Sequence, residues 1–261
     1  MTRAPGTAPA PHRIVDAQVN LASLLAIPRA FIEHQAANVH HRLDAYGVGG
    51  RPSRVRNQVF SLYEDDDADQ LVAEMDEAGV DQAFLVAPDY SHVADCALTQ
   101  SELAALHDRV NRRHPGRLHV FWGVDPRGGQ DGIDLFERCV TEYGFAGMKL
   151  YPPCGYSPSD PRLNPYFERC AHYGIPVLIH TGPGWGPLDF TFGSPLLVDR
   201  AARDFPASPS CRVATSALMQ PVRSRAAMAP ASCSAMTARA SLANSLRLSA
   251  ATRRHGRGTA M

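Results

Sequence analysis

The sequence predicts an α/β protein in which a parallel sheet is covered by helices. Between residues 67 and 204, short apolar runs rich in β-branched residues alternate with longer segments whose apolar residues recur at helical spacing. This alternation is typical of parallel sheets, whose crossover connections are helices. A chain of 261 residues is also long enough to bury the core of one α/β barrel.

The first predicted strand, 13–21, follows a Pro-rich leader, and residues 22–63, rich in His, Arg and Gly, are expected to form an irregular loop or insertion. The next helix, 67–78, closes at Gly79, and a second, 99–114, stops at the Pro115-Gly116 pair. The remaining predicted strands are 80–87, 118–124, 145–151 and 175–180, and the remaining helices are 133–143, 165–173 and 195–204.

Composition excludes several classes of protein. No run of 18 apolar residues is present, so we expect no membrane span, and residues 1–12 form a flexible leader without the apolar core of a secretory signal. The six cysteines include no CxxC pair, which favours reduced thiols and a cytoplasmic protein. All 26 acidic residues precede Ala207, which leaves residues 1–206 acidic, so we expect no nucleic-acid partner.

Three motifs resemble the amidohydrolase-2 family, which includes the aminocarboxymuconate-semialdehyde decarboxylase-like hydrolases and decarboxylases. Residues 14–21 (IVDAQVNL) are similar to the family's opening strand, I-I-D-A-H-x-H. Residues 144–152 (GFAGMKLYP) resemble its G-x-x-G-x-K-L-x-P strand, and residues 174–182 (GIPVLIHTG) resemble its G-x-P-V-x-x-H-x-G strand. The run 117–126 also fits. The resemblance covers about residues 13–206.

The resemblance implies a TIM-type (β/α)8 barrel with a divalent metal, zinc in our expectation, at the carboxyl ends of its strands. The family holds that metal with two histidines of the first strand, one of the fifth and an aspartate of the eighth. In this chain His180 matches the fifth-strand ligand, whereas Gln18 and Asn20 stand where the family has its histidine pair. Amide oxygens bind transition metals far more weakly than imidazole nitrogens, so these substitutions predict weak metal binding.

The candidate substrate-binding residues are Lys149, Tyr151 and Trp185. Lys149 is the only lysine of the chain and has the charge to hold a substrate carboxylate at the barrel mouth. The alternative for Lys149 is pairing with a carboxylate of the barrel itself. Trp185 lies in a Gly-rich loop and is expected to form a wall of the pocket.

Residues 207–261 differ abruptly from the rest of the chain. They contain no Asp, Glu, Lys, Ile, Phe, Trp or Tyr, and they are dominated by Ala, Ser and Arg. When residues 208–217 are back-translated and read one base earlier, the codons permit an apolar run followed by G-H-x-G, the family's sixth-strand pattern. We therefore expect an unstructured tail that is read out of frame, with a genuine disordered tail as the alternative. Only about five strand–helix units then remain, so the barrel is incomplete.

The sequence thus predicts a metal-dependent hydrolase of amide or ester-like bonds, or a non-oxidative decarboxylase of a small organic acid, with impaired activity. A small molecule is the expected partner. The alternative is a non-catalytic, metal-free remnant of the barrel. A third hypothesis, in which the basic tail binds polyanions, is disfavoured because its arginines are spread thinly among Ala and Ser.

Overall fold

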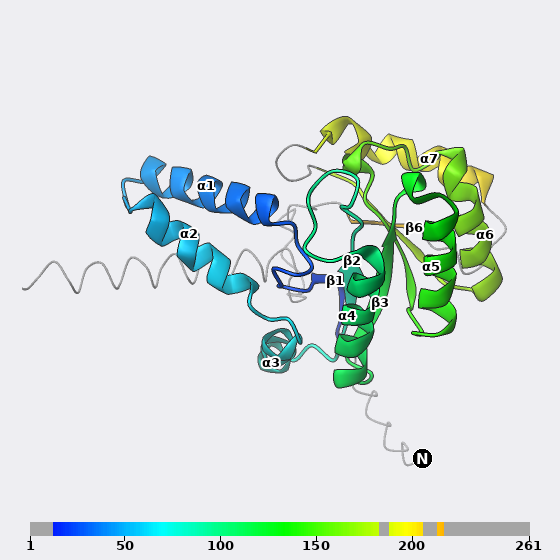
Figure 1. Cartoon of the computed structure of the whole chain (residues 1–261), viewed down its shortest axis with the longest axis horizontal. Coiled ribbons are helices and arrows are strands. Elements are labelled where there is room, and N and C mark those ends of the chain that lie inside the picture. Colours follow the sequence, from blue (N-terminus) through cyan, green and yellow to red (C-terminus); the bar gives the residue numbers. More distant parts are fainter. Residues whose placement is uncertain (1–12, 183–187, 206–212, 217–261) are drawn as a thin grey trace, which may run out of the picture.

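A computed structural model describes residues 13–182 and 188–205 and the backbone of residues 213–216. Its centre is one sheet of parallel strands in the order β1-β2-β3-β4-β5-β6 (Figure 1). The strands are β1 (Val15–Asn20), β2 (Gln82–Ala87), β3 (Leu118–Val124), β4 (Gly147–Leu150), β5 (Val177–His180) and β6 (Val213–Ser216).

The five strands predicted from the sequence are all present and lie side by side in chain order. The sheet has one strand more than expected, because residues 213–216 pair in parallel with β5. These four residues belong to the segment expected to be unstructured, so that expectation does not hold for them. Within the described part of the chain, β1 and β6 are the two edges of the sheet, which therefore forms an incomplete barrel.

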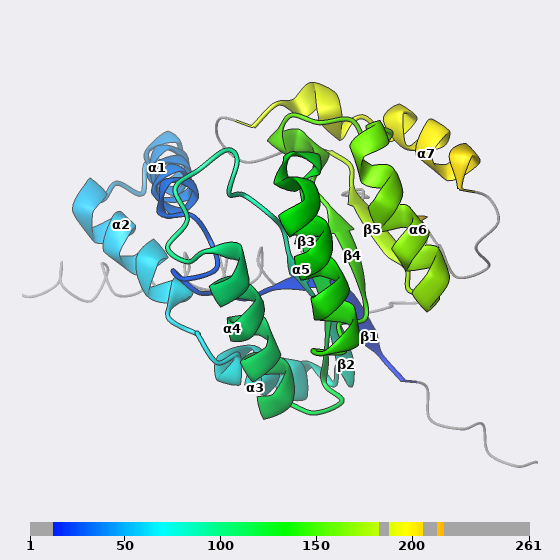
Figure 2. The ribbon, with the colours of Figure 1, turned by 45° about the vertical axis from the view of Figure 1, so that its right-hand side comes forward.

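Five helices alternate with the strands: α3 precedes β2, whereas α4, α5, α6 and α7 follow β2, β3, β4 and β5 in turn (Figure 2). A capping box between Thr99 and Glu102 begins α4, and Gly79, in the left-handed region, ends α3. These helices are α3 (Asp69–Ala78), α4 (Gln100–Arg113), α5 (Gly129–Thr141), α6 (Asn164–Tyr173) and α7 (Val198–Asp204). Short 3-10 turns occupy Ser61–Tyr63, Pro126–Gly128, Pro152–Cys154, Pro161–Leu163, Phe190–Gly193 and Pro195–Leu197.

Residues 22–63, expected to be irregular, instead contain two helices, α1 (Arg29–Ala45) and α2 (Pro52–Phe60). They form a hairpin that projects from the sheet (Figure 1). Its apolar residues pack on one another in a small core of their own, which includes Ile32, Ala36, Val55 and Val59. The helical spacing of these residues is diluted by many polar neighbours, because the hairpin buries only a narrow stripe. The sequence prediction was wrong here for that reason.

The two faces of the sheet have different surroundings. Alternate side chains of β2 to β5, such as Leu85, Trp122 and Ile179, join the main core beneath the helices. The intervening side chains face the concave side of the sheet, where Val86, Phe121 and Leu178 form a separate apolar cluster. The alternation of side chains along the strands places three residues on this concave face: Gln18, Lys149 and His180.

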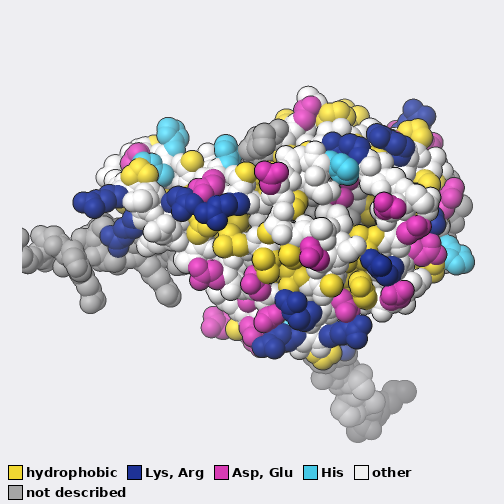
Figure 3. Space-filling view, in the orientation of Figure 1, with side chains coloured by type: hydrophobic (Ala, Val, Ile, Leu, Met, Phe, Trp, Pro, Cys, Tyr) yellow, Lys and Arg dark blue, Asp and Glu magenta, His cyan; other side chains and the backbone are white. Residues whose placement is uncertain are grey.

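The surface carries mixed charge, and no helix of the described chain is long and apolar enough to cross a membrane. On the face shown in Figure 3, acidic and basic side chains are interspersed over the body of the protein. This face offers no extended patch of a single sign.

Gly123 allows the close approach of β3 to the end of β2. A Cβ at this position would lie 2.2 Å from the Ala87 carbonyl oxygen and 2.4 Å from the Asp89 nitrogen. Because both are backbone atoms, Gly123→Ala should force the strands apart and lower the free energy of unfolding by about 1–3 kcal/mol or more. Chemical denaturation measures this change.

The matched control is Gly50→Ala, whose Cβ would meet Val55 at an ordinary 3.5 Å. This substitution should change stability by less than about 0.5 kcal/mol. Equal effects of the two substitutions would contradict the tight β2–β3 approach.

Candidate functional site

The candidate site lies on the concave face of the sheet, toward the carboxyl ends of β1, β4 and β5. In α/β barrels this end of the strands carries the active site. Lys149 pairs in register with Leu178, so His180 lies two residues further toward the carboxyl end of the neighbouring strand. The register thus places Lys149 and His180 toward the same end of two neighbouring strands.

Lys149 is the central residue of this group. Its side chain is 1% exposed, and its Nζ donates a hydrogen bond to Gln18 Oε1 at 3.3 Å. Strands β2 and β3 lie between the two residues in the sheet, so the bond crosses the concave side and requires the sheet to curl. Burial lowers the pKa of Lys149 from its usual value to about 7. Two roles were expected for Lys149. Among the described residues, no hydrogen bond joins Lys149 to a carboxylate, so pairing within the barrel is not supported.

His180 is the last residue of β5 and contacts the ring of Tyr151, with 4.4 Å between the ring centroids. Tyr151 in turn meets Tyr90 edge-on at 5.6 Å, and Tyr90 meets Phe31 of α1 at 5.0 Å. This aromatic series connects the helical hairpin to the candidate site. Burial raises the pKa of the Tyr151 phenol, which therefore stays neutral at physiological pH.

Two of the predicted residues contribute less to the geometry. Asn20 ends β1 beside Val86, and its side chain is exposed. Trp185 lies outside the described residues, so its expected role as a pocket wall stays a prediction.

Sequence reasoning did not single out two polar residues near the site. Asp16 is 7% exposed and accepts a hydrogen bond from the backbone N–H of Gln18 at 3.0 Å, which fixes the irregularity of β1. Thr181 follows His180, is 3% exposed, and its hydroxyl has no hydrogen-bond partner among the described residues. The signal for Thr181 was its position, because residues directly after a parallel strand line the functional end of the sheet.

The described residues do not fit a tight metal site. They contain no group of three or more His, Cys, Asp or Glu side chains placed to hold a metal ion. The Gln18 amide oxygen, which would have to coordinate, already accepts from the Lys149 amine. A metal at that oxygen would lie close to an amine that carries positive charge below pH 7, so the two compete for the same acceptor.

A family model described as amidohydrolase matches residues 37–213, well over half of the chain. The chain belongs to the amidohydrolase family. This confirms the family resemblance inferred from the sequence, and the motifs at residues 144–152 and 174–182 lie inside the match, whereas residues 14–21 precede it. No curated protein matches the chain significantly.

Solved structures support the same fold. An uncharacterised TIM-barrel protein from Bordetella bronchiseptica is 21% identical with a TM-score of 0.50, covering 77% of this chain and 66% of its own. A 5-carboxyvanillate decarboxylase from Novosphingobium aromaticivorans with bound manganese is 15% identical with a TM-score of 0.51, covering 78% and 65%. A 2,6-dihydroxybenzoate decarboxylase in complex with 2,6-dihydroxybenzoate is 16% identical with a TM-score of 0.50, covering 78% and 67%.

At these identities the amidohydrolase chain shares the fold of the TIM-barrel proteins, and it spans about two thirds of their length. This agrees with an incomplete barrel. The metal named in one of these structures is manganese, whereas we expected zinc.

Proposed function

We propose that this amidohydrolase acts on a small organic acid in a metal-dependent reaction, as a non-oxidative decarboxylase or as a hydrolase of an amide or ester-like bond. The observation that carries the proposal is the placement of Lys149, a buried amine on the concave face near the carboxyl ends of the strands. An ammonium group with little solvent around it binds a carboxylate strongly, because water does not screen the charges.

The surroundings of Lys149 suit an unsaturated or aromatic acid. Val86, Phe121 and Leu178 form an apolar surface on the same concave face, with Phe84 and Ala146 packed against them. Tyr151 and His180 add two stacked rings beside it. In our proposal the carboxylate of the substrate binds Lys149, and its apolar part lies against these side chains. The carboxylated aromatic acids named for two similar structures have this chemistry.

The metal would be held by His180 with Gln18 and Asn20, and it would polarise the substrate or a bound water. Only His180 is a strong ligand among the three. We therefore propose that the metal binds weakly and that activity is impaired. The contribution of the chain's own residues is to bind the acid at Lys149 and to keep water from it by burial.

A non-catalytic, metal-free protein is the second candidate. The absence of a metal-holding group from the described residues favours it. The two candidates differ in metal content and in turnover, whereas both allow Lys149 to bind a carboxylate.

We also propose that the chain is read out of frame beyond Pro206. The composition of residues 207–261 supports this, as does the end of the family match at residue 213. The nucleotide sequence around codon 206 tests it. A one-base change that restores G-H-x-G and a later strand-end aspartate is expected, and an open frame that encodes neither would contradict it.

The carboxylate proposal predicts a pH-dependent affinity. Titration calorimetry with 2,6-dihydroxybenzoate should show binding that weakens as the pH rises through about 7, since Lys149 then loses its charge. Lys149→Met should weaken binding at pH 6 by about tenfold or more. Resorcinol, the same ring without the carboxylate, should bind poorly to both proteins. If Lys149→Met binds 2,6-dihydroxybenzoate as tightly as the unchanged protein does, the proposed role of Lys149 is ruled out.

The metal proposal predicts a low metal content. Elemental analysis of the purified protein, after dialysis with zinc or manganese, should find much less than one equivalent. Gln18→His combined with Asn20→His should raise the content only modestly, because the strand that carries the family's metal-binding aspartate is not among the described strands. Stoichiometric metal in the unchanged protein would contradict the weak site.

A further inference from the structure

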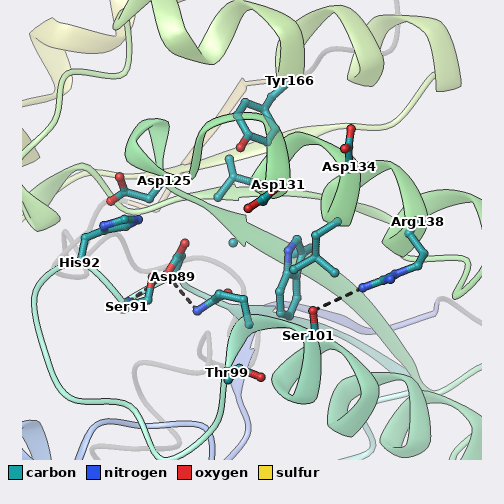
Figure 4. Close-up of a pocket in the computed structure, with 17 residues that line it drawn as sticks. Asp89, Ser91, His92, Thr99, Ser101, Asp125, Asp131, Asp134, Arg138 and Tyr166 are labelled. Atoms are coloured by element: carbon teal, nitrogen blue, oxygen red, sulfur yellow. Dashed lines mark hydrogen bonds between the residues drawn. The ribbon is translucent and has the colours of Figure 1, made fainter.

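A cavity of about 400 Å³ lies on the other face of the sheet, between the first turns of α4 and α5 and above the ends of β2 and β3 (Figure 4). Its floor includes Trp122 and Val124, which belong to the main core and not to the concave face. The cavity is therefore separate from the site around Lys149.

Four aspartates line this cavity against one arginine. Asp125 is neutralised by Arg127, which donates to both of its carboxylate oxygens at 2.7 and 2.6 Å. The described residues give no ion pair of this kind to Asp89, Asp131 or Asp134. Arg138 is directed toward Ser101, with 3.4 Å between Nη2 and Oγ. The cavity therefore carries an excess of negative charge.

Asp89 is the buried member of this acidic group. Asp89 is 9% exposed. Its Oδ1 accepts hydrogen bonds from the backbone N–H and the hydroxyl of Ser91 and from Gln100 Nε2. Burial raises the pKa of Asp89. The hydrogen bonds from Ser91 lower it in part, and the nearby charge of Asp125 raises it further. No cation of the described chain forms an ion pair with this carboxylate, so a bound cation would stabilise its charge.

Tyr166 supplies an independent indication of a ligand. This residue of α6 is 1% exposed and lines the cavity, and its hydroxyl has no hydrogen-bond partner in the part of the chain that the structure describes. In Figure 4 the hydroxyl end of the ring points into the same space as Asp131. A buried hydroxyl without a partner costs roughly 1–3 kcal/mol, and a ligand that bonds to it recovers that cost.

Gly132 allows α5 to approach this hydroxyl closely. A Cβ at residue 132 would lie 2.6 Å from the Tyr166 oxygen and would displace the ring. Gly128 also lines the cavity, and a Cβ there would be 3.8 Å from the same atom. The two glycines thus keep the Tyr166 ring in its position at the edge of the cavity.

We propose that this cavity binds a small organic cation with N–H donors, of the ammonium class, between Asp89, Asp131 and the Tyr166 hydroxyl. A metal ion is a poorer occupant, because no three ligating side chains of the described chain are close enough together to hold one. An ammonium group carried on an apolar body fits better, since it spans separated acceptors while the body lies near Trp122 and Leu135.

Titration calorimetry of the full chain tests the proposal with benzylammonium as the probe. We expect saturable binding, with a dissociation constant raised about tenfold by Tyr166→Phe and by Asp131→Asn. Tyr166→Phe removes a hydroxyl that has no partner, so it should not destabilise the fold. Asp131 is exposed, which makes the second variant independent of core packing.

Tyr173→Phe is the matched control, because its hydroxyl donates to Glu137 outside the cavity. It should leave the affinity for benzylammonium unchanged. Benzyl alcohol, which lacks the charge, should bind at least tenfold more weakly, and saturating 2,6-dihydroxybenzoate should not displace the cation. The proposal is overturned by an absence of saturable binding, by unchanged affinity in both Tyr166→Phe and Asp131→Asn, or by equal affinity for benzyl alcohol.

Discussion

The hydrogen bond from Lys149 to Gln18 depends on the curl of the sheet, and the candidate site depends on that bond. It joins β4 to β1 across the concave side, past two intervening strands. A flat sheet would hold these side chains far apart, since neighbouring strands are about 4.8 Å apart. Curling brings them together, excludes water from the amine, and lowers its pKa to about 7. The amine therefore changes charge near neutral pH instead of far above it.

The two faces of the same strands carry opposite chemistry. The concave face gathers a lysine, a histidine and an apolar surface, which suits an organic anion. The outer face ends in a cavity with unpaired carboxylates and a buried hydroxyl, which suits a cation. Gly123 of β3 lines this cavity and lies close to the backbone of Ala87 and Asp89, where a side chain would not fit.

The sequence predicted the sheet well because its strands are nearly continuous apolar runs, and residues 118–124 form β3 over the whole predicted range. The α1–α2 hairpin was missed because residues such as Ile32 and Val55 pack on each other and not on the sheet. Lys149 and His180 could be placed at one end by their strand motifs. The Gln18 contact could not, because it depends on curvature that no local pattern encodes. The Tyr166 cavity likewise combines residues from three separate helices, from strand β3 and from the loops after β2 and β3.

The site depends most directly on the protonation state of the Lys149 amine. Because Lys149 is the only lysine of the chain, its titration can be observed without overlap from other lysines. Protein labelled with ¹³C at the lysine ε carbon gives a single side-chain NMR signal for titration. We predict a midpoint near pH 7 in the folded protein and a return to the ordinary lysine range in denaturant. A folded-state midpoint of about 10.4, the ordinary lysine value, would contradict the buried, curled site.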